Sequence, residues 1–469
     1  MNRKQLILLE KWLKKANRKP IVLRGARQVG KSTLIRLFAK QQNRPLAEIN
    51  LERHPDLSSV FATKDPVLLV NLLEALPRTG AIAPDSLLFL DEIQAVPEAI
   101  PALRYFYEDM PQLPLIAAGS LLEFALSDHQ FSMPVGRVEY LHMGPMTFTE
   151  FLDALEETRL SDTIRRFHLG EELHPIIHKR LLELLRTYYF VGGMPEAVQT
   201  YAHSRRLKDV SEVHNSIIET YREDFPKYIG SRNLSRIQSV FNFAARNVGT
   251  KVKYSQFSSQ DKSATIKGDI ELLCMARVLS KVVHSHCSGL PLQADTEEKI
   301  YKLIFLDVGL MNAICGLNWQ AITQMTDAQL INEGAIAEQF IGQHLQDILS
   351  SSPNRELTYW LREGRAANAE VDYVLGLNGQ ILPIEVKSGA AGSLKSLHQF
   401  AGEKDVPLAV RFDTGLPSQQ TIQTQVRRAQ QTLEVSYRLL SLPPYLVERL
   451  PELVQEGAAN LDYRTHPHP

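Results

Sequence analysis

The sequence predicts an α/β protein with a parallel sheet, and three observations lead to this fold class. A short apolar strand, Pro20–Gly25, runs into a glycine-rich loop that is followed by residues with helical spacing. Further strand-like apolar stretches, separated by segments long enough for helices, cover Pro45–Glu52, Ser86–Gln94, Pro114–Ser120 and Val138–Gly144. The length of 469 residues leaves room for roughly two to four domains. We expect helices on both faces of the sheet and a ligand at the carboxyl edge of its strands.

The composition excludes several classes of protein. Hydrophobic residues make up 44% and charged residues 22% of the chain, as in globular proteins with large cores. A net charge of −1 gives no overall field toward nucleic acid or membranes, so any such site must be local. The cysteines, Cys274, Cys287 and Cys315, lack C-x-x-C spacing, which argues against disulfides and a zinc site and favours a reducing cytoplasm. No stretch reaches the ~20 apolar residues of a membrane span, and the apolar run at the start is too short for a signal peptide.

The loop after the first strand has the pattern of a phosphate-binding loop. GARQVGKST fits G-x-x-x-x-G-K-[ST], with Gly25, Gly30, Lys31 and Ser32 at the defining positions and Thr33 next to them. The two glycines permit backbone conformations that turn N–H groups toward phosphate, and the following helix adds its positive end. The lysine is expected to neutralise the β- and γ-phosphates of ATP, and the Ser32 hydroxyl to bind Mg²⁺.

Two other strand ends carry polar residues that suit the same site. SLLFLDEIQ is an apolar strand ending in Asp91 and Glu92. Asp91 is expected to hold the magnesium shell, and Glu92 to orient and polarise the attacking water. Ser120 ends the strand Pro114–Ser120, where a polar group can sense the γ-phosphate, although loops also favour serine.

Two later features leave alternatives open. Arg137 precedes the last apolar stretch and suits either an arginine finger, in cis or from a neighbouring chain, or a surface cap on a strand. Gly193 and Pro195 lie in GGMPEAV, after an aromatic-rich helix. Taken alone, this pattern indicates a helix that stops and restarts.

Several segments together resemble a large group of prokaryotic AAA-type ATPases, similar to the archaeal-type branch of signal-transducing P-loop ATPases. The segments are GARQVGKSTL, LLFLDEIQ, IAAGSLLEF, GRVEYLHMGPMTFTEFL and YFVGGMPEAV, in this order. The resemblance covers essentially the whole chain. It implies a nucleotide role for Gly193 and Pro195, a polar sensor at Ser120 and an active Arg137. It also implies a C-terminal domain similar to the PD-(D/E)XK nuclease fold, without identifying a substrate.

The middle of the chain predicts a helical lid followed by a winged helix. Thr147 and Glu150 have the spacing of a helix-capping box. Helix, turn, helix and hairpin follow from Asn233 to about Gly316, a layout typical of winged helices. This segment has few basic residues that could contact DNA: Lys251, Lys253, Lys262 and Lys267. So small a positive charge favours a structural or protein-contact role over DNA binding.

A His-x-His pair, His284 and His286, lies in the first strand of this hairpin. Such a pair on a strand can bind a metal ion. The sequence supplies no cysteine pair or acidic partner at a useful spacing, so solvent-facing histidines are expected.

Near the C-terminus, EVDYVLGLNGQILPIEVKSG predicts a hairpin with a tight turn at Asn378-Gly379. Paired residues then have numbers that sum to 757, which sets Asp372 opposite Glu385 and Glu370 opposite Lys387. Apposed carboxylates favour a cation, whereas a cross-strand charge ladder needs none.

The same residues resemble the PD-(D/E)XK core. The resemblance assigns Mg²⁺ or Mn²⁺ to Asp372 and Glu385, with Glu338 from the preceding helix completing the shell. Lys387 then orients the attacking water or stabilises developing charge, with Gln399 as an auxiliary polar residue.

The expected organisation is an ATPase core over residues 1–145, a lid and connector over 146–232, a winged helix over 233–316, a nuclease-like domain over 317–442 and a tail over 443–469. Two functions remain open. The first is a cytoplasmic ATPase coupled to metal-dependent cleavage of DNA or another nucleic acid. The second is an ATP-dependent switch whose C-terminal domain only binds nucleic acid or a protein partner. A homo-oligomer is compatible with either, and no membrane partner is expected.

Overall fold

The computed structural model describes residues 3–77, 79–120, 122–123, 133–228, 232–257, 261–317, 334–351, 356–362, 368–389, 393–428 and 431–465. The chain divides into two compact units. The first comprises Met1–Met146, Pro226–Gly230 and Met275–Val278, and the second Thr147–Phe225, Ser231–Cys274 and Leu279–Pro469. In the described part of the chain, none of the helices combines the length and the apolar character needed to cross a membrane.

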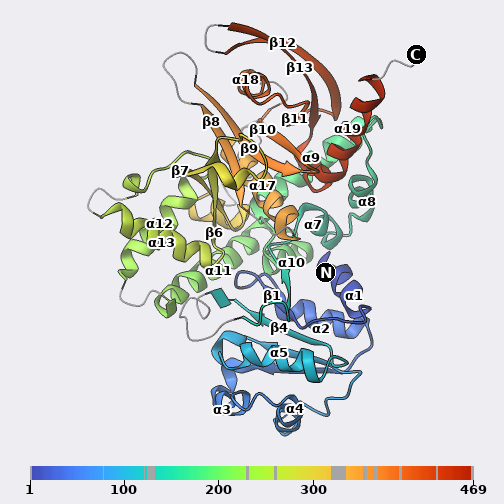
Figure 1. The fold of residues 1–469 in the computed structure, drawn as a ribbon, viewed down its shortest axis with the longest axis vertical. Coiled ribbons are helices and arrows are strands. Elements are labelled where there is room, and N and C mark those ends of the chain that lie inside the picture. The colour runs from blue at the N-terminus through green and yellow to red at the C-terminus, as the bar shows by residue number, and fades with distance from the viewer. Residues whose placement is uncertain are drawn as a thin grey trace. The chain divides into compact units, whose positions relative to one another are not determined.

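The first unit is built on a five-stranded parallel sheet in the order β2-β3-β4-β1-β5. Figure 1 labels β1 and β4 of this sheet, together with helices α1 to α5 of the same unit. Neighbouring strands of this sheet run parallel to one another, which confirms the prediction from the apolar stretches. The central strands are fully buried because helices and sheet share one apolar core. The strands are β1 (Ile21–Arg24), β2 (Leu46–Asn50), β3 (Leu87–Asp91), β4 (Leu115–Gly119) and β5 (Glu139–His142).

Helix α1 precedes the first strand of this unit, and the helices that follow lie between its strands in the chain. Alternation of strand and helix forces the strands to run in the same direction, since each helix returns the chain to the starting edge. The helices are α1 (Gln5–Leu13), α2 (Lys31–Gln41), α3 (Ser58–Phe61), α4 (Pro66–Glu74) and α5 (Ala99–Asp109).

The second unit begins with helices. The capping box predicted at Thr147 is present: its hydroxyl accepts from the Glu150 N–H, and the Glu150 carboxylate accepts from the Thr147 N–H. Its first helices are α7 (Phe148–Ala154), α8 (Thr158–Arg166), α9 (Pro175–Val191) and α10 (Pro195–Ser204). Helix α11 (Leu207–Tyr228) is followed by α12 (Leu234–Arg246), α13 (Ser263–Met275), α14 (Val308–Ile314), α17 (Gly334–Ile348), α18 (Lys395–Lys404) and α19 (Leu450–Thr465).

An eight-stranded mixed sheet in the order β12-β13-β11-β10-β9-β8-β6-β7 forms the rest of this unit. The hairpin β6–β7, expected to be the wing of a separate domain, joins this sheet through parallel pairing of β6 with β8. The boundary expected at 316/317 therefore does not separate two sheets. The strands are β6 (Leu279–Ser285), β7 (Thr296–Phe305), β8 (Leu357–Arg362), β9 (Ala369–Leu377), β10 (Gln380–Val386), β11 (Leu408–Phe412), β12 (Ser418–Arg428) and β13 (Gln431–Leu442).

The hairpin β9–β10 has the expected register. Gln380 pairs with Leu377 and Ile384 with Tyr373, so paired numbers sum to 757. Asn378 and Gly379 have φ values of 51° and 76°, the combination that a two-residue type I′ turn requires. A left-handed turn at these two residues therefore fixes which side chains of β9 and β10 face each other.

Candidate functional site

The phosphate-loop sequence lies between β1 and α2, as its pattern predicts. Gly30 has a φ of 91° and is the N-cap of α2, a conformation that side-chain-bearing residues avoid. Gly25 is needed for a different reason, because an added Cβ would lie 2.2 Å from the Met143 carbonyl oxygen. The glycines thus allow a tight loop whose N–H groups and helix start can face an anion.

Lys31 is the buried cation of this loop. Its side chain is folded over the loop, and Nζ donates to the carbonyl oxygens of Gly25 at 3.0 Å and Ala26 at 2.8 Å. Burial lowers the pKa of Lys31 to about 8, although Glu92 and Asp91 act in the opposite direction. A phosphate group beside this amine would favour its charged form.

Ser32 and Asp91 meet as predicted for a magnesium site. The Ser32 hydroxyl donates to Asp91 Oδ2 at 2.7 Å, which joins the start of α2 to the end of β3. Burial raises the pKa of Asp91, and the hydrogen bond from Ser32 opposes this rise. A hydroxyl and a carboxylate in contact offer the oxygen ligands that Mg²⁺ prefers. Thr33, the next residue, is exposed.

Glu92 is held by two polar side chains. Its Oε2 accepts hydrogen bonds from Ser120 Oγ at 3.2 Å and from Gln94 Nε2 at 2.5 Å. Glu92 itself has a φ of 51°, so the chain turns sharply at the end of β3. The carboxylate is therefore linked to the end of the neighbouring strand β4, where Ser120 is buried. Sequence reasoning placed Glu92 and Ser120 at one edge but did not identify Gln94.

Arg137 lies on the surface of the first unit. Its Nε donates to Glu108 Oε1 at 2.8 Å, and its guanidinium lies 5.9 Å from the centre of the Tyr107 ring. Glu108 also pairs with Arg104. In this arrangement Arg137 is an exposed ion-pair partner of Glu108, and both of its predicted roles, the arginine finger and the cap on a strand, stay predictions.

Gly193 and Pro195 lie in the second unit. Helix α9 ends at Val191 and α10 begins with Pro195, so the predicted stop and restart is present. The Gly193 N–H donates to Asp307 Oδ2 at 2.6 Å. Asp307 is buried, which raises its pKa to about 6. The nucleotide role that the resemblance implied for Gly193 and Pro195 remains a prediction.

The carboxylates predicted as a metal site in the second unit surround a lysine that the sequence reasoning missed. Lys302 on β7 is 1% exposed, and its Nζ lies 2.8 Å from Glu338 Oε1 and 2.7 Å from Glu370 Oε1. Asp372 Oδ1 is 3.4 Å from the same nitrogen. Three carboxylates hold the pKa of Lys302 well above its usual value despite burial. One signal in the sequence was available, since this lysine interrupts the apolar run IYKLIF.

Glu385 and Lys387 form the other half of the cluster. Lys387 Nζ donates to Glu385 Oε1 at 2.5 Å, and Glu385 Oε2 is buried without a hydrogen-bond partner. Burial, and next the charge of Asp372, raise the pKa of Glu385 to about 7. Burial also raises the pKa of Glu338 to about 8, in spite of Lys302.

The carboxylates of this cluster therefore share the ammonium groups of Lys302 and Lys387, and burial favours the protonated forms of Glu338 and Glu385. Asp372 is oriented by the Val386 N–H, which donates to its Oδ2 at 2.8 Å. Gln399, predicted as an auxiliary residue, donates to Glu403 at 2.8 Å. The structure thus brings Glu338, Asp372, Glu385 and Lys387 to one region, as predicted, but adds Lys302 and Glu370.

Three domain families match parts of the chain. Residues 17–152 match an AAA domain, residues 182–321 a domain of unknown function (DUF8612), and residues 333–433 a second domain of unknown function (DUF4143). The curated proteins include no match to this chain.

Several solved structures share a distant likeness. A Walker-type ATPase of Pyrococcus abyssi is 16% identical, with 67% of this chain and 95% of that chain covered and a TM-score of 0.44. The Aeropyrum pernix ORC2 protein is 12% identical, with 68% and 94% covered and a TM-score of 0.35. The Thermotoga maritima RuvB Holliday junction branch migration motor is 17% identical, with 59% and 87% covered and a TM-score of 0.27. At TM-scores below 0.5 these likenesses carry no functional conclusion for this chain.

The domain match and the loop geometry agree. Residues 17–152 match an AAA domain, and they contain the strand, glycine loop and helix that a nucleotide phosphate site requires. The first unit therefore contains an AAA-type P-loop ATPase domain.

Proposed function

We propose that the chain hydrolyses ATP in its first unit and uses the nucleotide cycle to control a binding site in its second unit. The observation that supports hydrolysis is the pair of hydrogen bonds from Ser120 and Gln94 to Glu92. A carboxylate fixed in this way beside Ser32 and Asp91 is suited to orient a water molecule for attack on the γ-phosphate.

Ser32 and Asp91 are the residues that would hold Mg²⁺ with ATP, and the ion would neutralise charge on the phosphates. Lys31 would leave its contacts with the loop carbonyls for phosphate oxygens, which are stronger acceptors for an ammonium group. Ser120 would respond to the γ-phosphate, since any change in its hydrogen bond alters the position of Glu92.

For the second unit, Lys302 favours a binding function over metal-dependent cleavage. Its ammonium group contacts Glu338 and Asp372, the residues that a divalent ion would need. Bringing a divalent ion next to a buried ammonium group adds like-charge repulsion at short range. In this proposal the second unit is an output that binds a partner, either nucleic acid or protein.

The basic residues of the second unit bear on the kind of partner. Lys251 pairs with Glu370 at 3.1 Å, and Lys267 pairs with Glu298 at 3.0 Å. Lysines engaged with carboxylates are less available to release counterions from a phosphate backbone. These pairs favour a protein partner.

Metal-dependent nuclease activity is the second candidate, and Glu385 favours it. Its Oε2 is buried without a hydrogen-bond partner, and Lys387 stands two residues away with its ammonium group at Oε1. A Mg²⁺ or Mn²⁺ ion held by Asp372 and Glu385 would satisfy this oxygen, and Lys387 would then be placed to stabilise charge on a phosphate.

One experiment separates the two candidates. The full chain is incubated with labelled single- and double-stranded nucleic acid and Mn²⁺, with and without ATP, while Mn²⁺ binding is measured by calorimetry. The binding-only function predicts neither Mn²⁺ binding at this cluster nor cleavage. The nuclease predicts Mn²⁺ binding that Asp372→Asn weakens strongly and Glu370→Gln weakens much less, together with cleavage that Lys387→Ala eliminates. Cleavage that survives Lys387→Ala would rule out this cluster as its source.

A further inference from the structure

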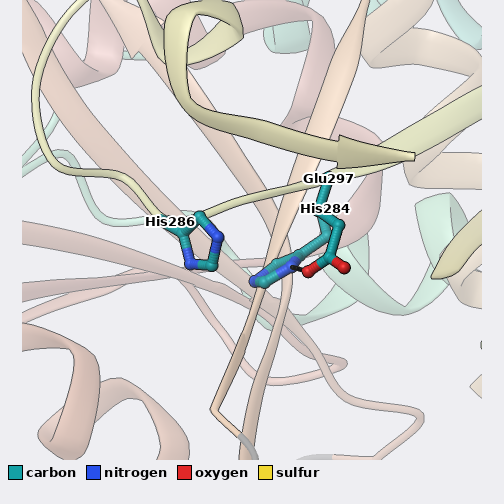
Figure 2. Close-up of side chains that lie close together, drawn as sticks. All are labelled: His284, His286 and Glu297. Carbon is teal, nitrogen blue, oxygen red and sulfur yellow. Dashed lines mark ion pairs between the residues drawn. The ribbon is translucent and has the colours of Figure 1, made fainter. Parts of the chain in front are cut away.

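Two histidines and a glutamate meet next to the segment that connects β6 and β7 (Figure 2). His284 belongs to β6, Glu297 to β7, and His286 follows the end of β6. One potential ligand atom from each residue lies within 4.8 Å of the other two. Among the residues that the structure describes, no other group of three histidine, cysteine or acidic side chains brings its ligand atoms this close together.

An irregularity in the pairing of β6 with β7 brings these side chains together. From Leu279 to Val283 the paired numbers sum to 584, which would set His284 opposite Ile300. The register shifts after Val283, and His284 pairs with Glu297 instead. Bulges of this kind redirect side chains. The expectation that no acidic partner lies nearby is therefore wrong, and so is solvent exposure for His284, whereas His286 is exposed as expected.

The three side chains differ in how firmly they are held. His284 is buried at 7% exposure, and its ring lies 5.6 Å from the ring of Tyr359. His286 is exposed and Glu297 is half-buried, so both can rotate toward a common point. Figure 2 shows the His284 ring between the His286 ring and the Glu297 carboxylate. The buried His284 ring is fixed, whereas His286 and Glu297 can move, so an ion bound to His284 could draw the other two side chains into its coordination shell.

The distances fit a small ion with modest side-chain movement. His284 Nδ1 lies 3.9 Å from Glu297 Oε2, and the ring centres of His284 and His286 are 4.8 Å apart. Tetrahedral zinc with bonds of about 2.0–2.1 Å needs ligand atoms roughly 3.3 Å apart. If the side chains of His286 and Glu297 rotate so that their ligand atoms move by roughly an ångström, the three ligand atoms reach the spacing that zinc needs.

The ligand types indicate the class of metal. Two imidazoles and one carboxylate are ligands of zinc and other first-row transition metals, whereas Mg²⁺ prefers oxygen alone. Nearby groups are otherwise engaged: Cys287 is buried with its Sγ directed at the Ser285 carbonyl, and Asp295 accepts from Ser288. Three protein ligands leave the fourth position for water or a ligand from outside.

We propose that His284, His286 and Glu297 form a Zn²⁺ site with one open coordination position. Strand β7 lies at the edge of the eight-stranded sheet, so an ion bonded to β6, β7 and the connecting segment would fasten this edge. The simpler alternative is a surface ion pair between His284 and Glu297 in which His286 takes no part. The site shares no residue with the Lys302 cluster, and it does not depend on the function proposed above.

Zinc binding to the full chain tests this proposal. The protein is treated with a chelator, kept free of nucleotide and titrated with Zn²⁺ by calorimetry, and Co²⁺ is used in parallel because tetrahedral Co²⁺ absorbs visible light. We expect one Zn²⁺ per chain, a visible Co²⁺ spectrum and a higher melting temperature with Zn²⁺. His286→Ala and Glu297→Gln alter side chains that are not buried, and each should weaken binding at least tenfold.

Two matched controls distinguish this site from general binding to surface histidines and acids. Glu298→Gln changes the exposed neighbour of Glu297 on β7, and His203→Ala removes an exposed histidine of α10; both should leave Zn²⁺ affinity unchanged. Equal affinity in wild type, His286→Ala and Glu297→Gln would overturn the proposal. So would the absence of Zn²⁺ binding to folded wild type. Loss in Glu297→Gln alone, with His286→Ala unaffected, would exclude His286 as a ligand and overturn the three-ligand site.

Discussion

The ammonium group of Lys302 lies 2.8 Å from the carboxylate of Glu338, and this buried pair is the centre of the acidic cluster in the second unit. Glu370 and Asp372 complete the surroundings of the same nitrogen. A cation in this position turns a group of carboxylates that would repel one another into a compact ionic network.

Replacing Lys302 should therefore destabilise the second unit. Lys302→Met leaves Glu338, Glu370 and Asp372 without their shared cation, and we expect a loss of about 3–5 kcal/mol in the free energy of unfolding. Urea unfolding followed by circular dichroism measures this loss. Lys299→Met, at an exposed position of the same strand, is the matched control and should change stability by less than about 0.5 kcal/mol. Equal effects of the two substitutions would contradict the assigned role of Lys302.

ATP hydrolysis should depend on Lys31 and Glu92 in different ways. Lys31→Ala removes the cation of the phosphate loop and should abolish nucleotide binding. Glu92→Gln keeps the hydrogen-bonding shape but loses the carboxylate that orients water, so ATP should still bind while turnover falls by roughly 10²–10⁴-fold. Phosphate release and fluorescent-nucleotide binding give the two readouts. Unchanged turnover in Glu92→Gln would remove Glu92 from the mechanism.

Arg137 offers a test of action between chains. If it completes the site of a neighbour, hydrolysis per chain should rise with protein concentration, and mixing Arg137→Ala with Lys31→Ala chains should restore some activity. Arg104→Ala is a matched control, because Arg104 shares the partner Glu108. A rate per chain that stays constant down to monomeric protein would exclude the role in trans.

Asp307 should make stability depend on pH with a definite sign. Its pKa is about 6 in the folded protein, because burial disfavours the charged form, and about 4 in an unfolded chain. The folded state binds more protons between these values, so the contribution of Asp307 to stability falls as pH rises from about 4 to 6 and is constant above that. The fall is on the order of 3 kcal/mol.

Comparison with Asp307→Asn isolates this contribution, because the amide does not titrate. The variant can lose stability at every pH through altered hydrogen bonds to Gly193 and Leu310. The informative quantity is the difference between the two unfolding free energies across the pH series. A difference that does not change between pH 4 and 6 would show that Asp307 has an ordinary pKa.

The sequence by itself determined the features that depend on short stretches of chain. The glycine loop followed β1 and preceded α2, and the apolar stretches became a parallel sheet, because local propensity and burial act within each segment. The register of β9–β10 was also predictable, since two left-handed residues, Asn378 and Gly379, fix a tight turn.

The tertiary structure decided which distant side chains share a site. Lys302 reaches Glu338 and Asp372 across 36 and 70 residues of chain, and no local pattern encodes that meeting. Strands β6 and β8 lie far apart in the sequence, so their pairing in one sheet could not be predicted from it either. A shift in register set His284 opposite Glu297, and such a shift depends on how the whole hairpin packs. Spacing in sequence describes contacts along one strand or turn, whereas contacts between strands are chosen by the packing of the complete sheet.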